Sequence, residues 1–341
     1  MKQIPILGEL KPGSTQRHLV KLPGAALAND EPRPVITVTG ATAGPVLFVN
    51  AGVHGGEYPA VEAVIRLGKT LDTKKITGTV ILMPVLNLPA FRTRTPFVCP
   101  VDNVNPNRVF PGDPTGSYSE QMTHALINEF VVHADAYIDL HGGDIPEALV
   151  PFVICAASDA EIGKKSKEIA MAFGLPYVLT ISKPVQPAKG LSSYAAAADN
   201  GTPAILAEAG GVGQMQEEAV ELLVNGVANV MRHLGMLYAD KTPTAKSQSR
   251  RLKSKTEETI STAAAKLLSK FEWLYTKSTG MWYPNVAPGN RVKEGQQIGT
   301  VGDLFGDTLE EIVSPADGVV LFLTINPSVL ENGLLMGIGA E

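Results

Sequence analysis

The fold is decided by residues 45–57, PVLFVNAGVHGGE, where an apolar run leads directly into His54, two glycines and Glu57. The run is short, continuous and rich in valine, which is typical of a strand buried on both faces of a parallel sheet. The two glycines allow the backbone to bend sharply where the strand ends. The segment therefore predicts a buried strand that delivers a histidine and a carboxylate to the carboxyl end of a sheet.

Six further apolar runs alternate with segments of helical periodicity through the first two-thirds of the chain. Together with the first run, the expected strands are 34–40, 45–53, 79–86, 136–141, 150–156, 176–181 and 203–209. The expected helices are 58–71, 117–133, 159–173, 191–200 and 214–237. This alternation predicts an α/β sheet with helices on both faces and with ligands at the carboxyl ends of its strands.

The composition changes after Tyr238. Residues 241–255 hold six basic residues and no acidic ones, which predicts a solvated linker or surface loop over 241–262. A patch that binds polyanions is the alternative interpretation. The preceding residues, 1–240, are then one α/β domain.

Short strands separated by Gly, Pro and Asp turns follow, and they predict a small all-β domain over 263–341. VKEGQQIGTVGD (292–303) and IVSPADGVV (312–320) resemble the barrel-sandwich domains that carry biotin or lipoate. Those carriers need a lysine at a hairpin tip, and the matching stretch, 303–314, contains none. The sequence therefore favours a lid or an assembly role for this domain over a cofactor-carrier role.

The overall composition excludes several classes of protein. The 341 residues include 44% hydrophobic and 18% charged residues and carry a net charge of −5, as in ordinary globular proteins and unlike nucleic-acid binders. No apolar run approaches the ~18 residues of a membrane span, and the N-terminus lacks the features of a signal peptide. With Cys99 and Cys155 expected as free buried thiols, we predict a cytoplasmic protein without nucleic-acid or membrane partners.

A candidate metal site lies at the ends of two predicted strands. The strand 136–141 ends at His141, followed by two glycines and an aspartate, much as 45–53 leads into His54 and Glu57. Two histidines and a glutamate with one position left for water form a catalytic zinc arrangement. Asp139, two residues before His141, is placed to orient that ring. A single strand-end histidine is more often structural, but the repeated pattern favours a metal.

Two further elements carry candidate chemistry. Glu208 closes the strand 203–209, and a carboxylate beside an activated water accepts its proton and later protonates a leaving amine. A helix-capping role is the alternative for this residue. In the loop-like segment 91–113, Asn107 and Arg108 are candidates to clamp a substrate carboxylate, and Arg94 to stabilise an oxyanion. Solvated surface arginines are the alternative there.

Four ordered motifs, HGGE (54–57), NPNRVFPGD (105–113), DLHGGD (139–144) and EAGG (208–211), resemble the aspartoacylase and succinylglutamate desuccinylase family. That family lies within the zinc carboxypeptidase group. The resemblance implies a zinc-carboxypeptidase-like three-layer α/β/α domain with a mixed sheet, followed by a C-terminal all-β barrel-sandwich domain. It also implies hydrolysis of the amide of a small N-acyl amino acid, with homo-oligomers as a possible assembly.

The resemblance assigns a role to each candidate residue. One Zn²⁺ per chain would bind His54, Glu57 and His141. Glu208 would be the general base and acid, Asn107 and Arg108 would hold a substrate carboxylate, and Arg94 would polarise the scissile carbonyl. Tyr194 and Tyr283 are the candidates for a substrate-contacting tyrosine.

The chain departs from the family pattern at two positions of the arginine loop. Asn103 stands where members often have glycine, and asparagine tolerates the left-handed backbone that such a turn needs. Pro106 stands before Asn107, where it fixes its own φ and restricts Asn105. The two departures bear on the shape of the pocket beside the carboxylate clamp.

Three functions are compatible with these features. A zinc-dependent N-acyl amino-acid deacylase is the first, and a metallocarboxypeptidase that cuts peptide C-termini is the second. We expect the C-terminal β domain to narrow access to the cleft, which favours the deacylase. A non-catalytic binding protein on the same fold is the third, and the intact set of ligands, base and arginine argues against it.

Overall fold

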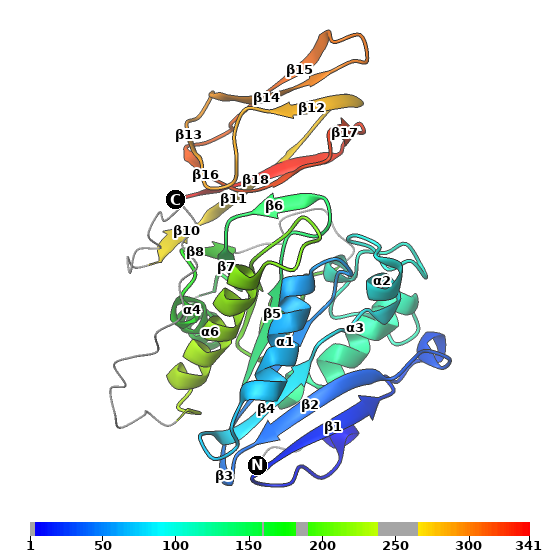
Figure 1. The fold of residues 1–341 in the computed structure, drawn as a ribbon, viewed down its shortest axis with the longest axis vertical. Coiled ribbons are helices and arrows are strands. Elements are labelled where there is room, and N and C mark those ends of the chain that lie inside the picture. Colours follow the sequence, from blue (N-terminus) through cyan, green and yellow to red (C-terminus); the bar gives the residue numbers. More distant parts are fainter. Residues whose placement is uncertain (1–3, 159, 182–189, 238–264) are drawn as a thin grey trace.

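A nine-stranded mixed sheet forms the centre of the larger domain (Figure 1). The computed structural model describes residues 4–158, 160–181, 190–237 and 265–341. In spatial order the sheet contains β1 (Ser14–Val20), β2 (Arg33–Thr39), β4 (Thr77–Met83), β3 (Thr42–Ala51), β5 (Ala136–His141), β9 (Ala204–Glu208), β7 (Phe152–Ala156), β8 (Tyr177–Ile181) and β10 (Lys266–Leu268). All seven strands expected from the apolar runs are present, which confirms the α/β class.

The four central strands β4, β3, β5 and β9 run parallel to one another. Antiparallel pairs occur between β1 and β2, β2 and β4, and β7 and β9, so the sheet is mixed. Because β3, β5 and β9 are parallel neighbours, their carboxyl ends meet at one edge of the sheet. The residues His54, His141 and Glu208 lie at or just beyond these ends.

Helices cover both faces of this sheet. They are α1 (Tyr58–Thr70), α2 (Leu88–Thr93), α3 (Tyr118–Glu129), α4 (Glu161–Phe173), α5 (Ser193–Asp199) and α6 (Glu217–His233), with short 3-10 turns η1 (Pro5–Leu7), η2 (Ala25–Leu27), η3 (Pro106–Arg108) and η4 (Val131–His133). The five expected helices are confirmed, whereas α2 was not expected. Successive residues of β3 alternate between the two faces: Leu47 and Val49 pack with α1, α4 and α6, and Phe48 packs with α3.

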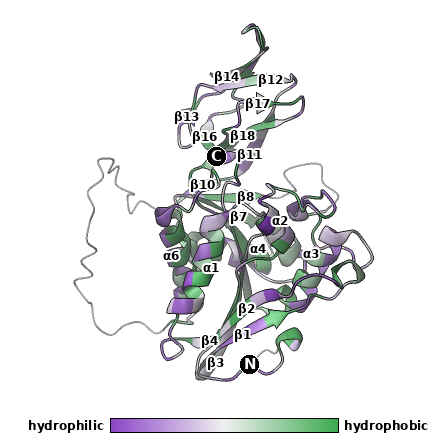
Figure 2. Cartoon of the chain, turned by 45° about the vertical axis from the view of Figure 1, so that its right-hand side comes forward, coloured by the Kyte–Doolittle hydropathy of each residue, from purple (hydrophilic) through white to green (hydrophobic). Residues whose placement is uncertain are grey.

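The colouring in Figure 2 agrees with this layering. Strands in the middle of the sheet are mostly green, whereas α1 and α6 show both colours, as amphipathic helices do. Among the described residues, no helix is both long and apolar enough to cross a membrane. Cys99 and Cys155 are buried free thiols, as expected.

Two antiparallel sheets form the C-terminal part of the chain. One contains β11 (Lys270–Tyr275), β18 (Leu334–Ala340), β16 (Gly318–Thr324), β13 (Arg291–Val292) and β6 (Glu147–Leu149), and the other contains β15 (Thr308–Val313), β14 (Gln297–Gly302), β12 (Gly280–Pro284) and β17 (Ser328–Val329). A separate apolar core that includes Trp282 and Ile298 fills the space between them. The predicted basic linker, 241–262, lies outside the described residues.

Each of the two parts gives one strand to the other. β6 belongs to the α/β part of the sequence, yet it pairs with β16 and places Glu147 opposite Thr324. β10 precedes the C-terminal sheets, yet it pairs in parallel with β8 of the large sheet. These exchanged strands hold the β domain against the carboxyl edge of the large sheet, above the candidate site (Figure 1).

Candidate active site

The residues at the carboxyl edge converge on one point. His54 follows β3, Glu57 is the residue that precedes α1, and His141 is the last residue of β5. One ligand atom from each of the three lies within 4.8 Å of the other two, and all three side chains are buried. The glycines of the HGGE motif permit this approach, because a Cβ at Gly55 would lie 2.3 Å from the backbone of Ala90.

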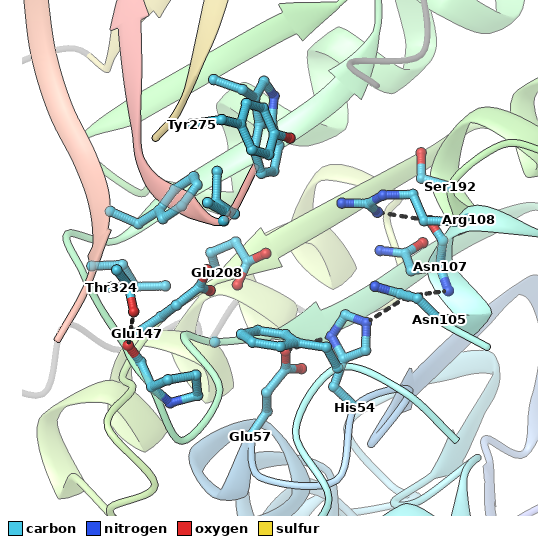
Figure 3. Close-up of a pocket in the computed structure, with 18 of the residues that line it drawn as sticks. His54, Glu57, Asn105, Asn107, Arg108, Glu147, Ser192, Glu208, Tyr275 and Thr324 are labelled. Atoms are coloured by element: carbon cyan, nitrogen blue, oxygen red, sulfur yellow. Dashed lines mark hydrogen bonds and ion pairs between the residues drawn. The ribbon is translucent and has the colours of Figure 1, made fainter. Parts of the chain in front are cut away.

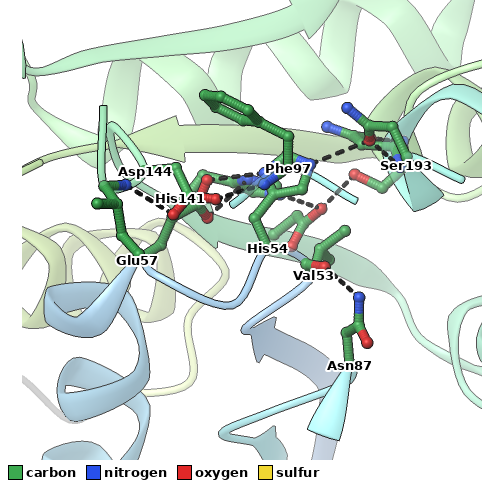
Figure 4. Close-up of polar contacts among 12 residues, drawn as sticks. Val53, His54, Glu57, Asn87, Phe97, His141, Asp144 and Ser193 are labelled. Carbon is green, nitrogen blue, oxygen red and sulfur yellow. Dashed lines mark hydrogen bonds and ion pairs between the residues drawn. The ribbon is translucent and has the colours of Figure 1, made fainter. Parts of the chain in front are cut away.

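Hydrogen bonds fix the orientation of both histidine rings (Figure 4). Nε2 of His141 lies 2.9 Å from Oδ2 of Asp139, and Nε2 of His54 lies 3.1 Å from Oδ1 of Asn105. Carboxylate and amide oxygens only accept hydrogen bonds, so each Nε2 carries the proton and donates it. Each Nδ1 is then the nitrogen with the free lone pair.

Both of these Nδ1 atoms face the carboxylate of Glu57. Nδ1 of His54 lies 2.8 Å from Oε1, and Nδ1 of His141 lies 3.0 Å from Oε2. The buried Oε2 is within contact distance but forms no hydrogen bond of acceptable geometry. Two nitrogen lone pairs and a buried carboxylate that point at one another repel unless a proton or a metal cation lies among them. The donor set, two imidazoles and one carboxylate, fits a divalent metal such as Zn²⁺.

The charges in this cluster depend strongly on one another. Burial alone would raise the pKa of Glu57, but the charges of His141 and His54 outweigh it and lower that pKa to about 2. Burial would lower the pKa of His141, but Asp139 and Glu57 raise it well above its usual value. Glu57 is therefore held as a carboxylate, which is the form that binds a metal.

Glu208 lies next to this cluster without joining it. It is the last residue of β9 and is the register partner of His141 on β5. Its Oε2 is buried and has no hydrogen bond among the described residues. Burial raises the pKa of Glu208 well above its usual range, with the charge of His141 acting against this and that of Glu57 adding to it. A buried carboxyl group whose pKa is raised is suited to general acid–base work.

A cavity of about 650 Å³ opens beside these residues, between the α/β domain and the β domain (Figure 3). His54, Glu57 and Glu208 line its floor. The opposite wall comes from the β domain and includes Phe271, Trp273, Tyr275, Phe322 and Leu334. The cavity is thus mostly apolar, with a few polar groups that converge on one place, as in enzyme pockets.

Asn107 and Arg108 also line the cavity, on the turn η3. Asn103 has a φ of 55°, so asparagine does supply the left-handed turn in this loop. Nη1 of Arg108 donates to the carbonyl oxygen of Asn107 at 2.8 Å, and its Cζ lies 5.8 Å from the ring centroid of Trp273. These contacts hold a half-buried positive charge in the cavity wall.

The remaining sequence candidates fall in different places. Arg94 is exposed at the end of α2 and is not among the residues that line the cavity, so the structure does not bring it to the site. Tyr194 lines the cavity and is 5% exposed, whereas Tyr283 is 48% exposed on β12 and lies outside it. Arg92 pairs with Glu31 on the surface.

Sequence reasoning missed four residues of the site. Glu147 and Phe97 line the cavity, and the Phe97 ring meets that of His54 edge-on at 6.2 Å. Asp144 accepts from the backbone N–H of Phe97 at 2.7 Å, and Ser193 donates to Asp139. Phe97 has a φ of 59°, a rare conformation for a bulky residue. Only Asp144 carried a signal in the sequence, as the last residue of DLHGGD.

Solved structures and curated proteins resemble the chain along most of its length. An N-alpha-acetyl-L-2,4-diaminobutyric acid deacetylase from Halomonas elongata is 29% identical over 296 residues, which cover 85% of this chain and 80% of that protein. A succinylglutamate desuccinylase/aspartoacylase from Rhodobacter sphaeroides has a TM-score of 0.78 at 24% identity and covers 97% of this chain and 95% of its own. The product-bound ectoine utilization protein EutE (DoeB) from Ruegeria pomeroyi has a TM-score of 0.80 at 22% identity, covering 98% and 97%.

The family model for the succinylglutamate desuccinylase/aspartoacylase catalytic domain matches residues 43–234. That range contains β3 with the HGGE motif, the arginine loop, β5 with DLHGGD, and β9 with Glu208. The match covers more than half of the chain and includes His54, Glu57 and His141, the three residues of the candidate metal site. The chain therefore belongs to the succinylglutamate desuccinylase/aspartoacylase family.

Proposed function

We propose that the protein is a zinc-dependent deacylase that hydrolyses the amide bond of a small N-acyl amino acid. The observation that carries the proposal is the convergence of the two Nδ1 lone pairs of His54 and His141 on the carboxylate of Glu57. Family membership and the deacetylase name of the Halomonas relative support the reaction type. A bound Zn²⁺ would supply the Lewis acidity that activates water and polarises the acyl carbonyl.

Each remaining step falls to a side chain of this protein. Glu208, whose carboxyl group lines the cavity next to the two histidines and Glu57, accepts a proton from the attacking water and returns it to the departing nitrogen. Asp139 keeps the proton of His141 on Nε2, and Asn105 does the same for His54. Arg108 and Asn107 bind the substrate carboxylate from the wall of the cavity. We give Arg94 no role, because it is exposed outside the cavity.

The cavity favours a small substrate over a peptide C-terminus. Its wall opposite Glu208 is formed by β11, β16 and residues 328–334 of the β domain. β6 and β10 fasten that wall to the large sheet through backbone pairing. A peptide chain that enters the site would have to pass this wall, whereas an acylated amino acid fits within the cavity. We therefore prefer the deacylase over the metallocarboxypeptidase.

The test combines a substrate panel with a variant of Glu208. Zinc-loaded protein is incubated with N-acetyl, N-succinyl and N-formyl amino acids and with short peptides, and freed amine is measured. We expect Glu208→Gln to keep one zinc per chain and to lose about 10²- to 10⁴-fold in rate, the usual scale for a general acid–base group.

Glu272→Gln is the matched control, because Glu272 lies on β11 but does not line the cavity. This control should retain wild-type turnover. Near-wild-type turnover in Glu208→Gln would overturn the assignment of the base. Release of C-terminal residues from peptides without deacylation would overturn the proposed substrate class.

A further inference from the structure

Glu147 lines the cavity but has no role in the proposed reaction. It is the first residue of β6, where the chain passes from the metal site to the β domain, and its side chain lines the cavity. The other carboxylates at the site have identified work: Glu57 faces the two histidines, Asp139 holds His141, and Asp144 accepts backbone N–H groups. Glu208 is the proposed base. Glu147 alone among them has no assigned role.

The carboxyl group of Glu147 is poorly satisfied. Its interactions with the described residues are charge interactions only, without a hydrogen bond. Burial raises its pKa to about 8, the charges of Glu57 and Asp144 add to this, and that of Arg108 opposes it. A desolvated carboxylate is stabilised chiefly by a cation at close range. The described residues provide none at hydrogen-bond distance, so burial favours the protonated carboxyl group, and a cationic ligand in the cavity would favour the carboxylate.

The backbone of Glu147 is held by hydrogen bonds on both sides. Its N–H donates to the carbonyl of Asp144 at 3.1 Å, and its carbonyl accepts from Val212 at 2.9 Å. A Cβ at Gly143 or at Gly211 would lie 2.4 Å from that carbonyl oxygen. The glycines that follow His141 and Glu208 thus leave the space in which Glu147 sits. A specificity residue needs this kind of rigid support.

The cavity carries a basic group, Arg108, and an acidic group, Glu147, in different parts of its lining. Figure 3 shows Glu147 and Arg108 on opposite sides of Glu208. A ligand whose amide lies at Glu208 therefore meets a guanidinium on one side and a carboxyl group on the other, and a cation beside that carboxyl group would favour its ionised form. A substrate with only a carboxylate would use one of these two groups and leave Glu147 unpaired.

We infer that Glu147 binds an ammonium group of the substrate, so that the substrate is an N-acylated diamino acid with its carboxylate at Arg108 and its free ammonium at Glu147. This inference rests on the proposed deacylase function. It assigns specificity, not bond cleavage, to Glu147. A charge-assisted hydrogen bond of this kind contributes about 1.5–3 kcal/mol, which corresponds to about 10- to 100-fold in affinity.

The experiment compares substrates that differ only in the ammonium group. Nα-acetyl-L-ornithine and Nα-acetyl-L-lysine are paired with Nα-acetyl-L-norvaline and Nα-acetyl-L-norleucine, and a diaminobutyrate derivative extends the series to a shorter arm. kcat/KM is measured for wild type, Glu147→Gln and the control Glu272→Gln, each with its zinc content verified. We expect wild type to prefer the cationic member of a pair, and Glu147→Gln to reduce that preference at least about tenfold, mainly through KM.

Three outcomes would overturn the inference. They are a wild type that hydrolyses the neutral member of each pair as well as the cationic one, a Glu147→Gln variant that loses activity equally on both, and a Glu147→Gln variant that does not retain its zinc. Calorimetric binding of L-ornithine against L-norvaline provides a readout without turnover. If no substrate is hydrolysed but wild type still selects the cationic ligand through Glu147, the proposed reaction fails and the inference about Glu147 holds.

Discussion

Replacing Asp139 with asparagine should weaken zinc binding by about tenfold. Asp139 is fully buried, accepts from Nε2 of His141 at 2.9 Å, and also accepts from Ser193. Asparagine keeps the shape and one acceptor oxygen but loses the charge. A hydrogen bond to a charged group contributes about 1.5–3 kcal/mol and a neutral one about 0.5–1.5, so the difference is about 1–1.5 kcal/mol. That difference corresponds to about 5- to 10-fold in the dissociation constant.

Asp139→Ala should have a larger effect, because alanine removes the acceptor as well. Losing a group that orients a metal ligand typically costs about 10- to 100-fold in affinity, and we expect this variant near the upper end. The order wild type, Asp139→Asn, Asp139→Ala is therefore part of the prediction. Asp72→Asn, a substitution in the loop between α1 and β4, is the matched control and should bind zinc as wild type does.

The loss of zinc affinity in Asp139→Asn should also depend on pH, and it should be larger at high pH than at low pH. Burial would lower the pKa of His141, but Asp139 and Glu57 raise it, so a proton on His141 competes with the metal. Removing the charge of Asp139 lowers this pKa and weakens the competition. The affinity of Asp139→Asn should therefore fall furthest below wild type near pH 8.5 and approach it near pH 6.

Competition with a chromophoric zinc chelator from pH 6 to 8.5 measures all three variants. Circular dichroism and thermal melting confirm that each is folded before its affinity is compared. If Asp139→Asn binds zinc as tightly as wild type at every pH, Asp139 does not orient His141 for a metal. If the loss is constant across the pH range, the proton competition at His141 is wrong although the orienting role stands.

Three further predictions follow from the site. Removal of zinc by a chelator should abolish deacylation and lower Tm, and added Zn²⁺ should restore both, because a ligand that binds only the folded state stabilises it. An unchanged Tm would contradict a metal bound at the buried site of the folded protein. The pKa of Glu147 in the folded chain is about 8, against an ordinary value of 4.5, so the wild type loses stability as the pH rises from about 4.5 to about 8. The gain in Tm of Glu147→Gln over wild type should therefore grow from pH 5 to pH 8. A gain that does not depend on pH would contradict this. Gly211→Ala should reduce activity on cationic substrates and lower Tm, because the added Cβ would lie 2.4 Å from the carbonyl oxygen of Glu147. Gly201→Ala is the control: its Cβ meets no neighbour within 4 Å, so it should lower Tm only by the strain of its positive φ.

The central strands could be predicted from the sequence because they are buried on both faces. β3, β5 and β9 read as continuous apolar runs, a pattern that few other elements share. β1 escaped prediction because its residues alternate between partly buried and exposed at the edge of the sheet. β6 and β10 have three residues each and exist only through pairing with a distant partner. Such strands have no local sequence signal.

The residues of the candidate site also fall into those that the sequence predicts and those that it does not. His54, Glu57 and His141 could be predicted because strand ends, glycines and metal-binding side chains coincide in two short motifs. Arg94 could not be placed, since the path of a long loop is set by contacts that residue spacing does not encode. Glu147 looks like an ordinary acidic residue after a proline. Its burial in the cavity depends on pairing with β16, more than 170 residues further along the chain.

The glycine pairs connect the candidate metal site to Glu147. HGGD and EAGG begin with His141 and Glu208, and the second glycine of each pair, Gly143 or Gly211, makes room for the backbone of Glu147. From Glu147 the chain continues as β6 into the sheet of the β domain, which also supplies the aromatic wall of the cavity. The position of that domain, the rim of the cavity and the carboxylate of Glu147 are therefore coupled through one short strand. If Glu147 selects the substrate as we infer, a substitution at this position changes the preferred substrate side chain without altering His54, Glu57, His141 or Glu208.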